Sequence, residues 1–338
     1  MISTVARGRP PAIPARSSSA TSGLTTSTRL KTSVLMASSA KVQALVALLV
    51  ASLAAQAVAL PLSSKRQSIS ALSQSEIATF TPYTHYASAG YCKPATTLAW
   101  NCGANCQANP SFVPVASGGD SVVTQFWFVG YDPTLGEVIV SHQGTDPDEI
   151  LPLLEDADII LEALDPSLFP GVSSSAHVHS GFAGSQSRSA SEVLAAVQTA
   201  LSKFGASKIT VTGHSLGAAI GLIDSVFLHL QFPKAAIKFV GYGLPRVGNQ
   251  EFANYVDSLP ISVSHINNKE DLVPILPGRF LGFHHTSGEI HIQDSGAWLS
   301  CPGQDNTSDE CIVGDVPNIF EGDTSFHDGP YNGVEIGC

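Results

Sequence analysis

The chain has 338 residues and is 43% hydrophobic, which is enough for one large domain with a sizeable core. Eight of its 17 lysines and arginines lie at or before residue 66, so residues 67–338 carry nine against 28 acidic residues, a net charge of −19. A body this acidic repels nucleic acid and is not attracted to anionic lipid by charge, so we expect no nucleic-acid partner and only apolar contact with a lipid surface.

Residues 1–66 are predicted to be a leader. After Met36 and Lys41 comes the apolar run VQALVALLVASLAAQAVA, whose final AVA resembles a cleavage site. A charged segment, an apolar segment and small residues in this order are typical of a secretory signal peptide, here at about residues 36–59. We therefore expect a secreted, extracellular protein without stable membrane insertion.

Two other interpretations of the leader stay open. The apolar run is near the lower length limit of a transmembrane anchor, and residues 1–35, rich in Ser, Thr, Pro and Arg, have the composition of an organelle transit arm. The dibasic pair Lys65-Arg66 indicates a processing site. A propeptide would then end at residue 66, and residues 67–338 would form a single domain.

All six cysteines follow the leader, and an even number in a secreted chain indicates disulfides. Sequence alone does not select among the possible pairings. The short separations favour two pairs and leave a third, namely Cys102–Cys106, Cys301–Cys311 and Cys92–Cys338. We find no zinc-type pair of CxxC motifs and expect no metal. Asn306 opens the one usable glycosylation sequon, since Pro110 excludes Asn109.

Strand-like and helix-like segments alternate along the chain, which predicts an α/β sheet. The runs QFWFVGY (125–131) and EVIVSH (137–142) are joined by the turn signal DPTLG and read as a hairpin. Residues 190–201 repeat apolar side chains at helical spacing. The later predicted strands are SKITVT (207–212), AIKFVGYG (236–243), ISVSHIN (261–267) and GEIHIQD (288–294).

Residues 213–217 read Gly-His-Ser-Leu-Gly between a predicted strand and a predicted helix. This is G-x-S-x-G in the strand, sharp turn and helix that the nucleophile elbow requires. The helix is indicated by one apolar face, made by Ala219, Leu222, Ile223, Val226, Phe227 and Leu230. We therefore predict Ser215 as a nucleophile whose proton a base must take. In this motif an acid and then a histidine follow the serine along the chain.

Four segments resemble the secreted fungal lipases of the class 3 family: HQGT (142–145), VTGHSLGAA (211–219), YGLPRVGN (242–249) and NNKEDLVPILP (267–277). The resemblance spans most of residues 80–338. It implies an α/β-hydrolase fold, with a central, mostly parallel sheet flanked by helices and a short helical lid. It also implies a serine hydrolase that needs no cofactor.

The resemblance implies the other two triad residues. The family's acid stands just before a hydrophobe-Val-Pro run, which selects Asp271 over its neighbour Glu270. The family keeps its base in a loop near the C-terminus, which selects His327. The remaining histidines after the acid, His284, His285 and His291, are interpreted as structural, as are His179 and Arg246.

Two donors are expected to stabilise the oxyanion. One is the backbone N–H of Leu216, directly after the nucleophile. The other is Thr145, which matches a family position that offers its own N–H and hydroxyl. The family commonly has arginine before the glycine of this segment, whereas this chain has His142-Gln143. That departure puts the local salt bridge in doubt.

The segment after Thr145 is predicted to be a short helical flap at 146–154. Asp146 as N-cap and the proline after it indicate a helix start, and Pro152 stops or kinks the helix. The family keeps its mobile lid at this place, and the flap's apolar side chains would cover the cleft. The lid residues are Asp146, Ile150, Leu151, Leu153 and Leu154. A fixed core helix is the alternative.

Together these features predict a secreted triacylglycerol lipase. It would cleave carboxylic esters of acylglycerols at a lipid–water interface through Ser215, His327 and Asp271. The alternatives are a short-chain or feruloyl carboxylesterase without interfacial activation and a catalytically inactive surface-binding protein. The apolar flap argues against the first, and the ordered Ser, Asp and His argue against the second. The sequence favours no particular oligomeric state.

Overall fold

The computed structural model describes residues 68–145, 152 and 160–338, which belong to the unit Lys65–Cys338. The predicted leader, its signal peptide and the lid residues Asp146, Ile150, Leu151, Leu153 and Leu154 lie outside the described residues. Within the described part, no helix combines the length and the apolar character that crossing a membrane requires.

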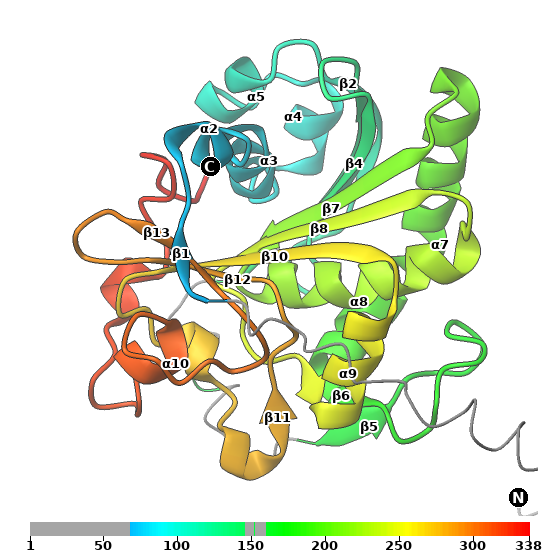
Figure 1. The fold of residues 1–338 in the computed structure, drawn as a ribbon. Helices are drawn as coiled ribbons and strands as arrows, with labels where there is room; N and C mark the ends of the chain where they lie inside the picture. The colour runs from blue at the N-terminus through cyan, green and yellow to red at the C-terminus, as the bar shows by residue number, and fades with distance from the viewer. Residues whose placement is uncertain (1–67, 146–151, 153–159) are drawn as a thin grey trace, which may run out of the picture. The chain divides into compact units, whose positions relative to one another are not determined.

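The described residues form a nine-stranded sheet in the order β1-β13-β12-β10-β8-β7-β4-β3-β2 (Figure 1). Its middle, β4-β7-β8-β10-β12, is parallel, and the pairs at both ends are antiparallel. The strands are β1 (Ser70–Ala71), β2 (Val113–Gly118), β3 (Trp127–Asp132), β4 (Glu137–His142), β7 (Lys208–His214), β8 (Ala236–Tyr242), β10 (Ile261–Asn268), β12 (Glu289–Ile292) and β13 (Trp298–Cys301). The predicted hairpin is β3–β4, and the other predicted strands are confirmed.

Helices cover both faces of this sheet. Figure 1 shows α7 (Ser180–Phe204), α8 (Leu216–Gln231) and α9 (Gln250–Ser258) on one side. On the other side lie α2 (Gln74–Ala78), α3 (Thr81–Ala89), α4 (Pro94–Leu98) and α5 (Ala104–Ala108). This arrangement and the parallel centre confirm the predicted α/β-hydrolase fold.

Side chains alternate between the two faces along the central strands, as a period of two requires. Val138 and Val140 of β4 belong to the core cluster with α7 and α8, whereas Ile139 between them belongs to the cluster with α3. The apolar face of α8 is buried in the first cluster, with Leu230 half-buried at its end, and this confirms the predicted helix. A sheet covered on both faces reads as continuous apolar runs, which explains the composition of β4 and β7.

A smaller four-stranded sheet of the described residues has the order β11-β9-β6-β5. Its strands are β5 (Leu161–Ala163), β6 (His177–His179), β9 (Gly248–Asn249) and β11 (Phe283–His284). The remaining elements are α10 (Ile312–Asp315) and the 3₁₀ turns η1 (Val273–Ile275), η2 (Arg279–Leu281) and η3 (Thr324–Phe326).

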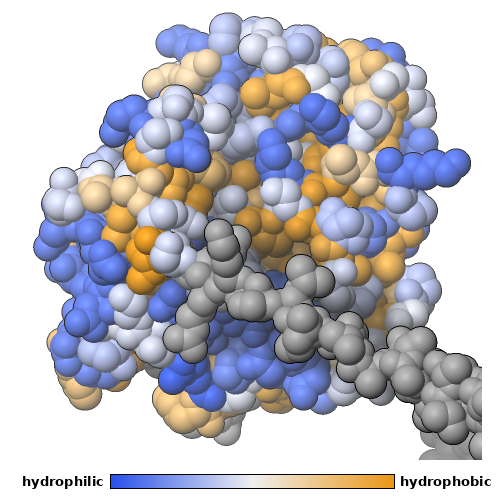
Figure 2. All heavy atoms as spheres, viewed as in Figure 1, coloured by the Kyte–Doolittle hydropathy of each residue, from blue (hydrophilic) through white to orange (hydrophobic). Residues whose placement is uncertain are grey.

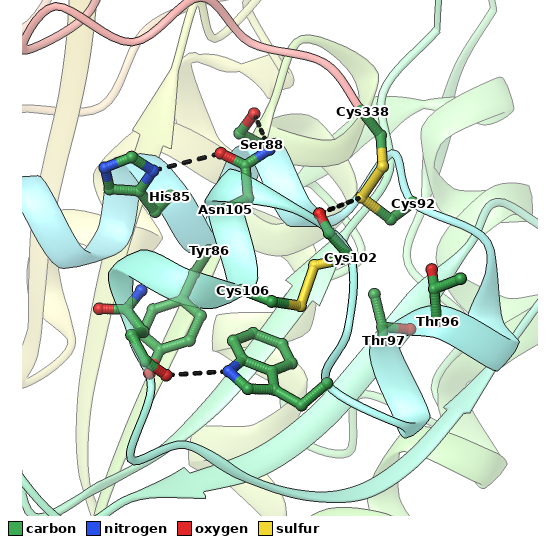
Figure 3. The surroundings of a disulfide bond; sticks show 12 residues. His85, Tyr86, Ser88, Cys92, Thr96, Thr97, Cys102, Asn105, Cys106 and Cys338 are labelled. Atoms are coloured by element: carbon green, nitrogen blue, oxygen red, sulfur yellow. Dashed lines mark hydrogen bonds between the residues drawn. A yellow bond between two sulfur atoms is a disulfide. The ribbon is translucent and has the colours of Figure 1, made fainter.

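The described cysteines form the three favoured disulfides, Cys92–Cys338, Cys102–Cys106 and Cys301–Cys311. Figure 3 shows how Cys92, after α3, holds the C-terminal residue Cys338. Ser88 and Asn105 reinforce this attachment, because each donates a side-chain hydrogen bond to the backbone oxygen of Gly337, at 2.8 and 2.9 Å. The C-terminal segment that carries His327 is thus anchored to the helices above the sheet.

Glu289, Cys301 and Cys311 are the one group of potential metal ligands found among the described residues. Both sulfur atoms of this group are joined in a disulfide, so neither is available as a thiolate ligand.

The double variant Cys92→Ser/Cys338→Ser should lose about 2–5 kcal/mol of unfolding free energy, since this bond closes a very long loop in the unfolded chain. The sequence separation is 246, against 4 for Cys102 and Cys106. Calorimetry of both double serine variants checks this. Equal losses, or a larger loss for the Cys102→Ser/Cys106→Ser control, would contradict the loop-length argument.

Candidate active site

Ser215 lies on the sharp turn between β7 and α8. Its φ of 58° and ψ of −128° are unusual for a residue with a side chain. The flanking glycines explain how the turn fits. A Cβ on Gly213 would lie 2.4 Å from the backbone oxygen of Gly217, and a Cβ on Gly217 would lie 2.3 Å from that of His142. The predicted G-x-S-x-G therefore takes the geometry of a nucleophile elbow.

His327 and Asp271 form a fully buried pair. His327 Nδ1 donates to Asp271 Oδ2 at 2.8 Å, and both side chains are 0% exposed. Asp271 follows β10, and its other carboxylate oxygen accepts from the backbone N–H of Val273 at 3.0 Å. Because this carboxylate can only accept, it holds the imidazole in the tautomer that carries its proton on Nδ1. Nε2 is then left as the basic nitrogen.

The elbow and this pair meet through two neighbouring residues. The ring of His214, directly before Ser215, lies 4.3 Å from the ring of His327, between centroids. Gly243 leaves space for the ring of His327, since a Cβ at this position would lie 2.7 Å from Cε1 of that ring. Ser215 Oγ and His327 Nε2 are buried, and neither has a hydrogen-bond partner among the described residues. Proton transfer from Ser215 Oγ to His327 Nε2 would therefore not require breaking a hydrogen bond to another described group.

His214 fixes the backbone of His327. Its Nε2 donates to the backbone oxygen of His327 at 2.8 Å, and its Nδ1 accepts from the Tyr91 hydroxyl at 2.8 Å. Burial holds the pKa of His214 well below its usual value, and His327 lowers it further. The neutral ring is a rigid support that adds no charge beside the catalytic candidate.

The other candidates for acid and base are engaged elsewhere. His285 Nε2 bonds to the backbone oxygen of Pro274, and His291 bonds to those of Lys269 and Glu310. His284 Nδ1 lies 3.1 Å from Asp305. Of the two adjacent acids, Asp271 pairs with the histidine, whereas the half-buried Glu270 makes a side-chain hydrogen bond with Asp294.

Both oxyanion candidates line one cavity of about 620 Å³, together with Tyr91 and Asp328. Leu216 is the first residue of α8, where backbone N–H groups have no partner within the helix. Thr145 follows β4, and its hydroxyl accepts a hydrogen bond from Gln125 Nε2 at 2.9 Å. A larger cavity of about 930 Å³ adjoins the segment after Asp271 and is lined by Ile275, Leu276, Phe280 and Val316, among others.

Sequence reasoning missed a buried polar cluster between β4 and α8. His142 Nε2 lies 2.9 Å from Asp224 Oδ2, and Gln186 Nε2 donates to the other carboxylate oxygen at 2.9 Å. Asp224 is fully buried in the middle of α8. A lone carboxylate in so apolar a helix was the available signal, because a buried charge needs partners. The cluster connects β4, which precedes Thr145, to α8, which begins at the elbow.

Arg246 has the structural role that the sequence suggested. Its guanidinium donates to Asp305 at 2.7 Å and to the backbone oxygens of Pro277 and Ile275. Burial lowers the pKa of Arg246, and Asp305 opposes that shift. Arg246 therefore fixes the segment that runs on from Asp271. His179 stacks on Phe182 at the start of α7, where it caps the helix through Gly181.

The amino-acid sequence is similar to those of known lipases. Residues 139–281 match the family described as Lipase (class 3). The secreted mono- and diacylglycerol lipase MDL2 of Malassezia globosa is 31% identical over 225 residues, which cover 66% of this chain and 72% of that protein. LIP2 of Malassezia restricta, also named a secreted mono- and diacylglycerol lipase, is 32% identical over 194 residues. That match spans 56% of this chain and 61% of LIP2.

Two solved structures that resemble this chain are also lipases. The Rhizomucor miehei lipase propeptide complex matches with a TM-score of 0.70 and 25% identity over 81% of this chain and 86% of that one. A triacylglycerol lipase described as having a serine protease triad as its catalytic centre matches with a TM-score of 0.68 and 26% identity over 80% and 98%. The chain thus has the α/β-hydrolase fold of fungal lipases. It belongs to the class 3 lipase family, which confirms the resemblance.

Burial of Glu289 predicts a pH dependence of stability. Glu289 lies under α10, and burial raises its pKa to about 8 from 4.5. The folded protein therefore binds a proton that the unfolded chain has released, so this contribution is present below about pH 4.5 and is lost as the pH rises through about 8. Glu289→Gln keeps an acceptor for the N–H of Ile312, which Glu289 Oε1 accepts at 2.7 Å. We expect the melting temperature of this variant to fall less than that of wild type between pH 5 and 8, and equal slopes would contradict the assignment.

Proposed function

We propose that this protein is a secreted serine hydrolase that cleaves the carboxylic ester bonds of acylglycerols. The observation that carries the proposal is the buried hydrogen bond from His327 to Asp271 beside the elbow that bears Ser215. Family membership supports the same chemistry. Secretion is supported by the disulfides and by the relatives, which are named as secreted lipases.

In the proposed mechanism, Ser215 Oγ attacks the ester carbonyl carbon while His327 Nε2 takes its proton. Asp271 holds the imidazole and stabilises the imidazolium that forms. The tetrahedral oxyanion accepts hydrogen bonds from the backbone N–H of Leu216 and from Thr145. Collapse of the intermediate expels the alcohol, which takes the proton from His327. A water then repeats the sequence on the acyl-enzyme, releases the fatty acid and restores Ser215.

An apolar substrate suits the surroundings of this site. Figure 2 shows one face of the molecule, on which apolar residues are exposed near the middle among hydrophilic ones. The cavity that Leu216 and Thr145 line also has the apolar side chains of Val122, Val123 and Ile336 in its wall, which an acyl chain can contact. Action at a lipid–water interface rests on the lid at 146–154, which stays a prediction.

Two substrate classes follow from this proposal. The sequence favours triacylglycerols, whereas the names of the Malassezia relatives favour mono- and diacylglycerols as a second candidate. Assays with triolein, diolein and monoolein separate them. Tributyrin hydrolysis measured below and above emulsion formation tests the interface, and a rate indifferent to the emulsion would favour the short-chain esterase alternative.

Ser215→Ala should lower kcat by about 10⁴- to 10⁶-fold, because the covalent step is lost while the fold is kept. The exposed Ser202→Ala on α7 is the matched control and should keep wild-type activity. Labelling with a fluorophosphonate followed by mass spectrometry locates the nucleophile. Retention of activity in Ser215→Ala, or a label at another residue, would refute the serine hydrolase assignment.

A further inference from the structure

Gln125 contacts the side chain of an oxyanion candidate and has had no role so far. It lies just before β3 and donates from Nε2 to the hydroxyl oxygen of Thr145 at 2.9 Å. Gln125, Thr145 and Leu216 line the same cavity of about 620 Å³. The contact therefore lies in the cavity that both oxyanion candidates line.

The direction of this hydrogen bond decides what Thr145 can do. An amide NH₂ group only donates, so the hydroxyl oxygen of Thr145 is the acceptor and uses one of its lone pairs in this bond. The hydroxyl hydrogen is then turned away from Gln125 and is available to another acceptor. A partner that accepted instead, such as a carboxylate, would draw this hydrogen away from the cavity.

Gln125 is held in place by the neighbouring Gln143. The side chain of Gln143 accepts from the backbone N–H of Phe126 and donates to Ser121 Oγ, both at 2.9 Å. Its backbone N–H also donates to the oxygen of Phe126 at 2.8 Å. Gln143 stands where the family commonly has arginine, and here it fastens the segment 121–126 to the end of β4 without a charge.

The same segment is rigid at its other end. One carboxylate oxygen of Asp120 accepts from the backbone N–H groups of Val122, Val123 and Thr124, at 2.8 to 2.9 Å. Gln125 thus extends from a loop that is fixed on both sides. This geometry suits a group that must hold a hydroxyl in one orientation before substrate arrives.

We propose that Gln125 is a positioning residue of the oxyanion hole. It sets the Thr145 hydroxyl as a hydrogen-bond donor to the tetrahedral intermediate of ester hydrolysis. The inference rests on the proposed function and adds a residue to it. Gln125 itself does not touch the reacting atoms.

Reversing the hydrogen bond tests the proposal. Gln125→Glu keeps the shape of the side chain but presents only acceptors to the Thr145 hydroxyl. With p-nitrophenyl butyrate as substrate, kcat should fall about 10- to 100-fold while KM stays within about twofold, since the interaction is made in the transition state. Retention of kcat in Gln125→Glu would overturn the proposal.

Gln198→Glu is the matched control for the change of an amide to a carboxylate. Gln198 is exposed on α7, and its Nε2 also donates to a hydroxyl, that of Ser202, at 3.1 Å. This variant makes the same change in charge and hydrogen bonding at a position outside the cavity. It should keep wild-type kcat and KM.

A double-mutant cycle separates the hydroxyl effect from the added charge. Thr145→Val removes the hydroxyl and keeps the backbone N–H, so Gln125→Glu should have little further effect on kcat in that background. The inhibition constant of a boronic acid that mimics the intermediate should rise in parallel with the fall in kcat. An equal loss in the Thr145→Val background would assign the effect to charge alone and overturn the proposal.

If Gln125→Glu does not fold, as judged by its melting temperature, Gln125→Ala takes its place in the cycle. It should lower kcat by about three- to tenfold in wild type and leave kcat unchanged in Thr145→Val. Additive losses would overturn the proposal. Failure here is distinct from failure of the proposed function, because wild-type turnover and labelling at Ser215 would persist. A wild-type protein without turnover would overturn both.

Discussion

The hydrogen bond between His327 and Asp271 is the interaction on which the rest of this site depends. Both side chains are removed from water, so the carboxylate can stabilise an imidazolium far better than it could at a surface. Such a pair is costly unless its remaining lone pairs and protons are engaged. Here the N–H of Val273 donates to the second carboxylate oxygen. Among the described residues His327 Nε2 has no hydrogen-bond partner, and in the proposed mechanism this nitrogen takes the proton of Ser215.

Much of the fold serves to bring this pair to Ser215. The parallel strands β7 and β10 end at the same edge of the sheet, which delivers the elbow and the loop of Asp271 together. His327 has no strand of its own. It is held by the neutral ring of His214, and its segment is anchored through Cys338 to Cys92 beside α3. A disulfide and a few hydrogen bonds thus hold His327 in the absence of a regular element.

Local sequence patterns predicted the features that depend only on residues close together in the chain. The elbow at 213–217 and the helix after it follow from spacing and from the space that two glycines leave. Asp271 and His327 came from resemblance to a family. The alternating pattern around His291 indicated a strand histidine, but the residues next to Asp271 do not by themselves separate it from Glu270. The cysteine pairs followed from separation along the chain, and the structure has the same pairs.

What the sequence did not predict depends on contacts between distant segments. Asp224 is the one carboxylate in a largely apolar helix, and its partners His142 and Gln186 are known only once β4 and α7 lie beside it. Replacement of the family's arginine by Gln143 put the local salt bridge in doubt. In three dimensions its neutral amide holds the loop of Gln125 instead. Periodicity predicts which face is buried, but not which polar groups meet there.

Catalysis in this proposal requires that folding bring His327 and the oxyanion donors to the buried hydroxyl oxygen of Ser215. A crystal structure of the protein inhibited by an alkyl phosphonate tests this most directly. The account predicts phosphorus bonded to Ser215 Oγ, with His327 Nε2 within about 3 Å of that oxygen and the phosphonyl oxygen within about 3 Å of donors on Leu216 and Thr145. A phosphonate bonded elsewhere, or a His327 ring turned away from Ser215, would contradict it.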